Sequence, residues 1–230
     1  MSDRSPPPPA DCGRAAKLKV WDIPTRVFHW LLAALVAAAW LTIELGVIEW
    51  HARIGQAVLA LIVYRVLWGI VGSETAQFWN FIKGPTAVFS YACGLLTGRP
   101  PQVVGHNPLG ALMIVALLGL IATQATLGLF ANDDIYFDGP LRHLVDKATS
   151  DSLTGLHKLG FNFILAAVSI HITAALFHLF VKRENLIAPM ITGRKDWQGS
   201  RPSLRFTPAW VALPVLAVAA ALVWAAVTHL

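Results

Sequence analysis

Residues 153–181 read LTGLHKLGFNFILAAVSIHITAALFHLFV, and this stretch decides the fold of the chain. It is apolar over more than the roughly 20 residues that an α-helix needs to cross the hydrocarbon core of a bilayer. It also carries three histidines, His157, His171 and His178. A polar imidazole inside a membrane is unfavourable unless it serves a function, so these side chains are candidate site residues on a membrane helix.

Four further apolar stretches are long enough to span a membrane, and they cover residues 27–46, 50–71, 108–130 and 208–228. Hydrophobic residues make up 56% of the chain and charged residues 13%, which is about half the share of charges in soluble domains. A weaker apolar segment, 78–96, is interrupted by Lys83, Gly84 and Pro85, which favours an amphipathic helix at the membrane surface. These patterns predict an all-α integral membrane protein, with a four-helix transmembrane bundle and a fifth transmembrane helix at the C-terminus.

Lysine and arginine side chains gather before the first stretch, between the second and third, and between the fourth and fifth. The positive-inside rule assigns these regions to the cytoplasm, so the N-terminus is predicted to be cytoplasmic and the C-terminus periplasmic, in a bacterial inner membrane. The loop 132–151 then faces outward, with five aspartates against one arginine and one lysine. Because the net charge of +5 arises from the flanks of apolar stretches, we expect a lipid bilayer and no nucleic acid as a partner.

The chain divides into three parts. Residues 1–19, which contain the proline run 6–9, are predicted to be a disordered cytoplasmic tail. Residues 20–195 form the membrane domain, and residues 196–230 form a linker and the fifth transmembrane helix.

Four histidines fall into two pairs by their depth in the bilayer. His157 and His171 are 14 residues apart, which places them about 21 Å apart on nearly one face of a helix. His51 begins the second helix at the outer surface, opposite His157, and His29 lies on the first helix at the level of His171. Two imidazoles from facing helices can bind one haem iron without covalent attachment. The pattern predicts two non-covalent, bis-His b haems, one at each level.

Other interpretations of these histidines are weaker. The cysteines, Cys12 and Cys93, belong to no Cys-x-x-Cys-His motif, which argues against a c-type haem. A single histidine is more often a hydrogen-bonded core residue, and a metal site without porphyrin needs clustered ligands. The paired depths of four histidines favour haem over both.

Two further residues are candidates for cofactor contact. His178 follows His171 by two helical turns on almost the same face, so it can replace His171 as the inner ligand, or hydrogen-bond a haem propionate or a quinone. Arg65 follows His51 by 14 residues and lies at the level of the inner haem, where a buried guanidinium needs an anion such as a propionate. The alternative for Arg65 is a side chain that reaches to the inner membrane surface.

With these residues in view, the chain resembles the bacterial cytochrome b561 and nickel-hydrogenase b-type cytochrome family over about residues 20–195. The stretches that carry the resemblance are WDIPTRVFHW at 21–30, HARIG at 51–55, YRVLWGIVG at 64–72, His157 with His171 and His178, and KREN at 182–185. The resemblance implies a four-helix core with two b haems, the outer one on His51 and His157 and the inner one on His29 and His171. The Pro-rich tail and the fifth helix depart from the smallest family members.

The resemblance also implies quinone chemistry, with electrons exchanged with a periplasmic redox protein: a hydrogenase or other dehydrogenase subunit, or a c-type cytochrome. We therefore expect an electron-transfer subunit of an oxidoreductase more than a stand-alone enzyme. The alternative is a stand-alone superoxide:quinone oxidoreductase, with Arg53 and Lys158 attracting the anion near the outer haem. A remote alternative is a haem-free membrane anchor or transporter. The fifth helix could contact a partner subunit, seal the bundle or support a homodimer.

Overall fold

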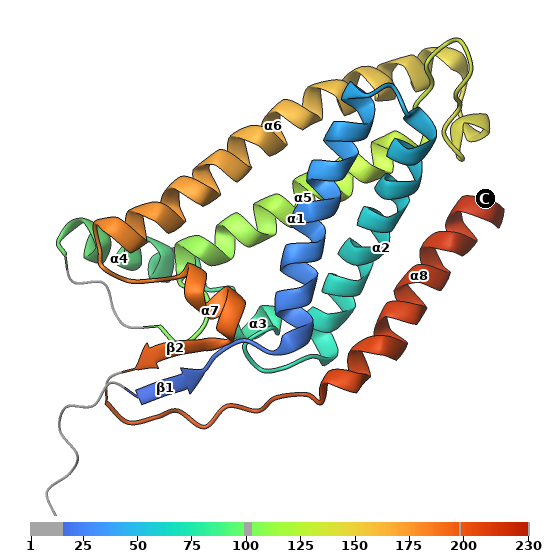
Figure 1. Ribbon diagram of the computed structural model, residues 1–230. Helices are drawn as coiled ribbons and strands as arrows, with labels where there is room; N and C mark the ends of the chain where they lie inside the picture. Colours follow the sequence, from blue (N-terminus) through green and yellow to red (C-terminus); the bar gives the residue numbers. More distant parts are fainter. Residues whose placement is uncertain (1–15, 99–102, 198, 230) are drawn as a thin grey trace, which may run out of the picture.

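The computed structural model describes residues 16–98, 103–197 and 199–229, and five helices in this part of the chain are long and apolar enough to cross a membrane (Figure 1). They are α1 (Ile23–Glu44), α2 (Ile48–Val71), α5 (Pro108–Leu129), α6 (Lys147–Phe180) and α8 (Ala212–His229), the last preceded by the 3-10 helix η2 (Ala209–Val211). Large apolar side chains such as Phe163 and Leu213 point outward, as lipid-facing residues do. The predicted all-α membrane fold is confirmed.

Side-chain caps determine where three of these helices begin. Asp22, Asn107 and Asp146 each accept the backbone N–H of the residue three positions later, at 2.7 Å in every case. α6 begins at Lys147, ahead of the predicted start at residue 153, because Asp146 caps a polar first turn. Its 34 residues extend for about 51 Å, more than the roughly 30 Å of hydrocarbon, so the helix continues beyond the bilayer.

The predicted surface helix at 78–96 is divided in two. α3 (Phe78–Phe81) is a single turn, and α4 (Pro85–Leu96) starts anew with a proline in its first turn. The division falls at Lys83 and Gly84, since Pro85 disfavours the helical conformation in the residue before it.

The spanning helices pack in sequence: α1 on α2, α2 on α5, and α5 on α6, while α8 covers another side of α2. Two buried clusters join them. The first links α1, α2 and α8 through Phe28, Leu61, Tyr64, Trp68 and Ala219, and the second links α2, α5 and α6 through Val58, Ile62, Ile121 and Ile164. The fifth helix therefore lies at the edge of the bundle, against α2.

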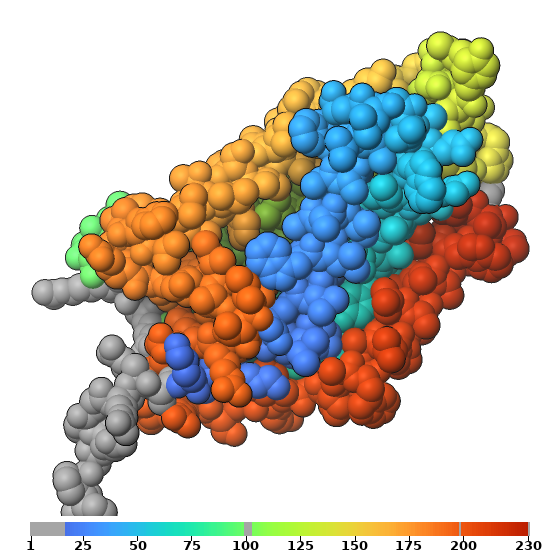
Figure 2. Space-filling model, viewed as in Figure 1, coloured from blue at the N-terminus to red at the C-terminus, as the bar shows by residue number. Residues whose placement is uncertain are grey.

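Within the described residues, α1 and α6 do not pack closely against each other. In Figure 2 the surface is hollowed between the blue of α1 and the orange of α6, with the green of α5 at its floor. We call this space the α1–α6 furrow. It separates the helix that carries His29 from the helix that carries His157 and His171.

A two-stranded antiparallel sheet closes one end of the bundle, which we call the sheet end. It pairs β1 (Ala16–Lys19) with β2 (Arg194–Trp197), next to the short helix α7 (Ile187–Thr192). The last four residues of the predicted tail thus form a strand, and residues 1–15 lie outside the described residues. The boundary predicted at residue 195 falls within β2.

The chain between β2 and α8 is held against the end of α2. The backbone N–H of Arg205 donates to the Glu74 carboxylate at 3.0 Å, and the N–H of Thr207 donates to the Ser73 hydroxyl at 3.1 Å. These bonds explain why α8 starts beside α2. The opposite end of the bundle holds the loop 130–146 with the 3-10 helix η1 (Arg142–Leu144), and we call it the acidic-loop end.

Candidate functional site

His51 and His157 face each other near the acidic-loop end. Their ring centres are 6.0 Å apart and their planes are at 89°. The Nδ1 atom of His51 donates to the Ala39 carbonyl at 2.8 Å, and that of His157 donates to the Gln124 carbonyl at 2.9 Å. A carbonyl can only accept, so each ring carries its hydrogen on Nδ1. This leaves both Nε2 atoms with a lone pair for a metal.

His29 and His171 face each other nearer the sheet end. Their ring centres are 6.4 Å apart and their planes are at 53°. The Nδ1 atom of His29 is buried and has no hydrogen-bond partner among the described residues. A buried polar atom without a partner is costly, so the inner pair is less fully hydrogen-bonded than the outer pair.

The spacing within each pair fits an iron between two imidazoles. Metal–nitrogen bonds of about 2 Å on either side separate the two ring centres by about 6 Å, close to both observed values. Among the described residues, no group of three or more His, Cys, Asp or Glu side chains gathers around one point. Haem suits such pairs because the porphyrin supplies the other four ligands.

Glycines leave room around the outer pair. A Cβ at Gly128 of α5 would lie 3.0 Å from Cε1 of His157, so this glycine permits the observed ring position. A Cβ at Gly55, one turn after His51 on α2, would meet no atom within 4 Å. The space at Gly55 is therefore open in the structure.

Arg65 lies inside the protein near the sheet end, with 3% of its surface exposed. Its guanidinium stacks over the Phe78 ring at 4.7 Å, and Nη2 donates to the Ala76 carbonyl at 3.1 Å. The Nη1 atom is buried without a hydrogen-bond partner in the described part of the chain. The guanidinium thus reaches the segment that follows α2, and it keeps one donor available for an anion.

His178 makes a different set of contacts from His171. Its Nδ1 lies 3.1 Å from Oε2 of Glu184, and its ring meets that of Phe177 edge-on. The structure therefore brings His171 to His29, and it places His178 in a polar network at the end of α6.

His106 was missed as a site residue because the sequence places it only in a loop. Its ring lies between Trp21 and Phe81, with centroid distances of 4.3 and 4.6 Å. Burial, followed by the charges of Arg65, His29 and His171, lowers the pKa of His106 to about 3. His106 is therefore a neutral imidazole beside the inner pair. The Asn-Pro start of α5 directly after it is the signal that could have located it.

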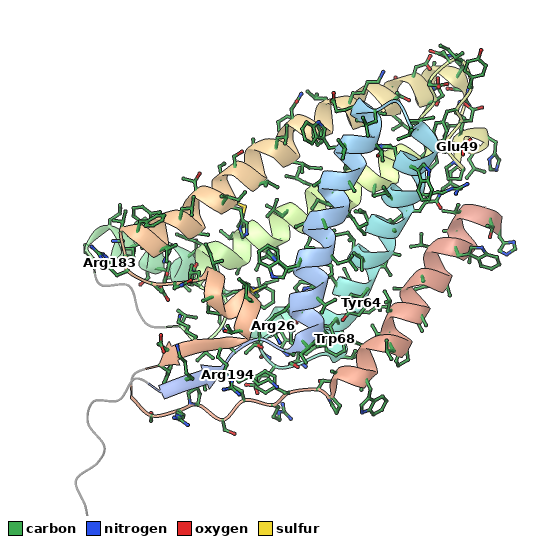
Figure 3. All side chains as sticks on the ribbon, viewed as in Figure 1. Arg26, Glu49, Tyr64, Trp68, Arg183 and Arg194 are labelled. Atoms are coloured by element: carbon green, nitrogen blue, oxygen red, sulfur yellow. The ribbon has the colours of Figure 1, made fainter. Side chains whose placement is uncertain are left out.

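Charges differ between the two ends of the bundle. Arg26 and Arg194 lie at the sheet end, whereas Glu49 lies at the opposite end (Figure 3). In the acidic loop, Asp133 accepts the backbone N–H groups of the residues at 135–137, and these bonds lower the pKa of its carboxyl. Lys147 bonds Asp134 and Asp151, so part of the acidic charge is balanced within the loop.

Comparisons with known proteins agree with this architecture. The family model described as prokaryotic cytochrome b561 matches residues 20–193. A probable Ni/Fe-hydrogenase B-type cytochrome subunit of Rhizobium leguminosarum bv. viciae is 23% identical over 216 residues, covering 76% of this chain and 87% of the relative. The protein of the same description from Rhodobacter capsulatus is 23% identical over 229 residues, covering 82% of this chain and 85% of the relative.

No solved structure matches the chain significantly. The family model nevertheless spans most of the described helices, including all four that carry or adjoin the histidine pairs. This chain therefore belongs to the prokaryotic cytochrome b561 family, as a multi-pass membrane protein that binds haem b and transfers electrons.

Proposed function

We propose that this protein carries electrons across a bacterial inner membrane through two non-covalent b haems. The outer haem is held by His51 and His157, and the inner haem by His29 and His171. The proposal is carried by one observation: two imidazole pairs lie at two levels along α6. The ring centres are 6.0 Å apart in the outer pair and 6.4 Å apart in the inner pair. When bound, each haem takes up and releases one electron at its iron.

The residues of the chain orient and isolate these sites. The carbonyls of Ala39 and Gln124 accept the Nδ1 hydrogens of the outer imidazoles, which fixes the tautomer that leaves Nε2 for a metal. The 14-residue spacing on α6 sets the two levels about 21 Å apart. Arg65 supplies a buried cation near the inner level, and its unpaired Nη1 is suited to a haem propionate.

We assign a quinone in the membrane and a periplasmic redox protein as the two partners. The relatives are described as hydrogenase b-type cytochrome subunits, which favours a hydrogenase subunit over another dehydrogenase or a c-type cytochrome. Arginines at the sheet end support a cytoplasmic N-terminus, and the C-terminus of α8 is then periplasmic. Trp224 of α8 and Trp210 of the preceding η2 are exposed, so this side of the molecule is available to lipid, to a partner subunit or to a second copy.

The superoxide alternative has less support from the structure. The pocket of about 200 Å³ beside Lys158 is lined by Asp133, Asp134 and Asp151. The lining holds three carboxylates and one lysine, and Lys147 pairs with two of the carboxylates, so the pocket has no excess positive charge to attract a small anion. Arg53 lies 4.0 Å from Glu49, so its charge is also partly balanced.

A pyridine haemochrome assay of the detergent-purified protein tests the proposal. Two b haems per chain support the transmembrane route. One haem per chain would contradict the transmembrane route. The absence of haem would support the alternative of a haem-free membrane anchor or transporter.

A further inference from the structure

A polar network of three side chains lies at the end of α6. The Nδ1 of His178 lies 3.1 Å from Oε2 of Glu184, and Nζ of Lys195 lies 2.7 Å from Oε1 of the same carboxylate. His178 is 6% exposed, and only 13% of the Lys195 side chain is exposed. The Glu184 side chain between them is 34% exposed, so the network reaches solvent at its carboxylate. Burial of the other two groups is costly, and apolar side chains would fill the same space with less penalty. His178, which belongs to the spanning helix α6, is therefore a candidate functional residue.

The turn after α6 builds this network. Arg183 adopts a left-handed conformation, with φ of 58°, which residues other than glycine rarely take. The turn brings the backbone N–H of Glu184 to 2.9 Å from the His178 carbonyl. The strained residue thus folds the Glu184 side chain back over His178.

Neighbouring elements hold the network in place. Lys195 of β2 also donates to the Val103 carbonyl at 3.1 Å, and Lys182 donates to the Leu95 carbonyl of α4 at 2.6 Å. Tyr91 of α4 is buried, and its burial, followed by the charge of Glu184, raises its pKa to about 12. Partial burial by itself raises the pKa of Glu184, but Lys195 and then His178 lower it overall. The carboxylate therefore stays ionised and accepts hydrogen bonds.

The position of His178 relates the network to the inner pair. His178 follows His171 by seven residues on α6, so it lies about 10 Å nearer the sheet end on almost the same face of the helix. Glu184 engages Nδ1, which leaves Nε2 as the nitrogen that can exchange a proton with another molecule.

We propose that His178 donates protons to a quinone reduced at the inner haem, and that the Glu184 carboxylate positions His178 and stabilises its protonated, imidazolium form. This inference rests on the proposed function. A quinone that takes up two electrons, delivered singly through the haems, must also take up two protons to become a quinol. The imidazolium form of His178 gives its Nε2 proton to a quinone oxygen and becomes a neutral imidazole that keeps its Nδ1 hydrogen on Glu184. Water from the cytoplasmic side then returns a proton to Nε2, once for each of the two protons that the quinone takes up.

Stopped-flow oxidation of the pre-reduced, detergent-purified protein by a short-chain ubiquinone tests this role. The variants are Glu184→Gln and His178→Gln, and Glu184→Asp keeps the carboxylate. Asp196→Asn is the matched control, because it removes a neighbouring carboxylate that pairs with Lys17 and is exposed. We expect Glu184→Gln and His178→Gln to slow haem oxidation by roughly ten- to a hundredfold at unchanged haem content, the range expected for a lost proton donor. Glu184→Asp and Asp196→Asn should keep the wild-type rate within about threefold.

Added imidazole should restore part of the rate in His178→Gln, which a purely structural role would not allow. A wild-type rate in Glu184→Gln and His178→Gln would overturn the inference and leave the proposed function standing. Slow oxidation with lost haem, and no recovery with imidazole, would show a structural role and would also overturn it. Failure of the wild-type haems to be oxidised by quinone would overturn the proposed function itself.

Discussion

His157 and Gln124 bond each other twice across the interface of α5 and α6. The imidazole Nδ1 donates to the Gln124 carbonyl at 2.9 Å, and the Gln124 side-chain amide donates to the His157 carbonyl at 2.8 Å. Gln124 thus holds both the imidazole ring and the backbone of His157 in place.

Replacing Gln124 with leucine should weaken the outer site. The backbone bond to the imidazole stays, but the amide bond is lost, which costs about 1 kcal/mol of unfolding free energy. We expect a lower thermal midpoint in detergent and faster loss of one haem on dilution. Gln124→Glu keeps the size and an acceptor but not the donor, so it should behave like Gln124→Leu. An unchanged haem-loss rate in both would contradict the role given to this residue.

Single substitutions of the paired histidines should each remove one haem. His157→Ala and His171→Ala are expected to reduce the haem content from two to one per chain, because an iron held by one imidazole is bound far less tightly. The pyridine haemochrome assay measures this, and redox titration identifies which haem is lost. His229→Ala, at the end of α8, is the control and should retain both haems. Loss of both haems from a single variant would mean that the sites are not independent.

Gly128 should tolerate no larger residue while the outer haem is bound. A Cβ 3.0 Å from the His157 ring forces the imidazole or the helix to shift, so Gly128→Leu should broaden or abolish the spectrum of one haem. Gly119 lies on the same helix with no atom within 4 Å of an added Cβ, so Gly119→Leu is the matched control. Equal spectra for the two variants would refute this steric argument.

Arg65 should raise the reduction potential of the inner haem, since a buried cation favours the form with one more electron. We expect Arg65→Gln to lower one midpoint potential by an amount on the order of 60 mV, a tenfold change for a one-electron couple. Potentiometric titration of the α-band resolves the two haems. Arg65→Lys keeps the charge and should shift the potential less. If Arg65→Gln leaves both potentials unchanged, the guanidinium does not act on a haem.

Asp133 should make the acidic loop sensitive to pH. Its three backbone hydrogen bonds lower the carboxyl pKa below the ordinary value of 3.8. The ionised carboxylate thus stabilises the loop above pH 3.8, and this stability is lost as the pH falls through the lower, folded-state pKa. Hydrogen exchange of the amides at 135–137, corrected for intrinsic rates, measures the effect. Asp133→Asn should remove the pH dependence, whereas Asp138→Asn should retain it.

The sequence alone determined the number and placement of the membrane helices. The thickness of the bilayer demands about 20 apolar residues in each, and the chain has five such stretches. The helical period also set His157 and His171 on one face at two depths, before any fold was known. The division of the surface helix before Pro85 and the start of α6 after Asp146 depend on single residues, so hydropathy alone did not predict them.

Only the tertiary structure decided which residues meet. His171 and His178 lie about two turns apart on almost the same face of α6, so helical geometry cannot say which of them faces His29. The packing of α6 on α5 and the turn at Arg183 bring His171 to His29 and His178 to Glu184. The burial of His106 and the position of α8 against α2 likewise depend on contacts between segments far apart in the chain. Hydrophobicity directs a segment into the membrane, but the contact between two particular side chains depends on how whole helices pack.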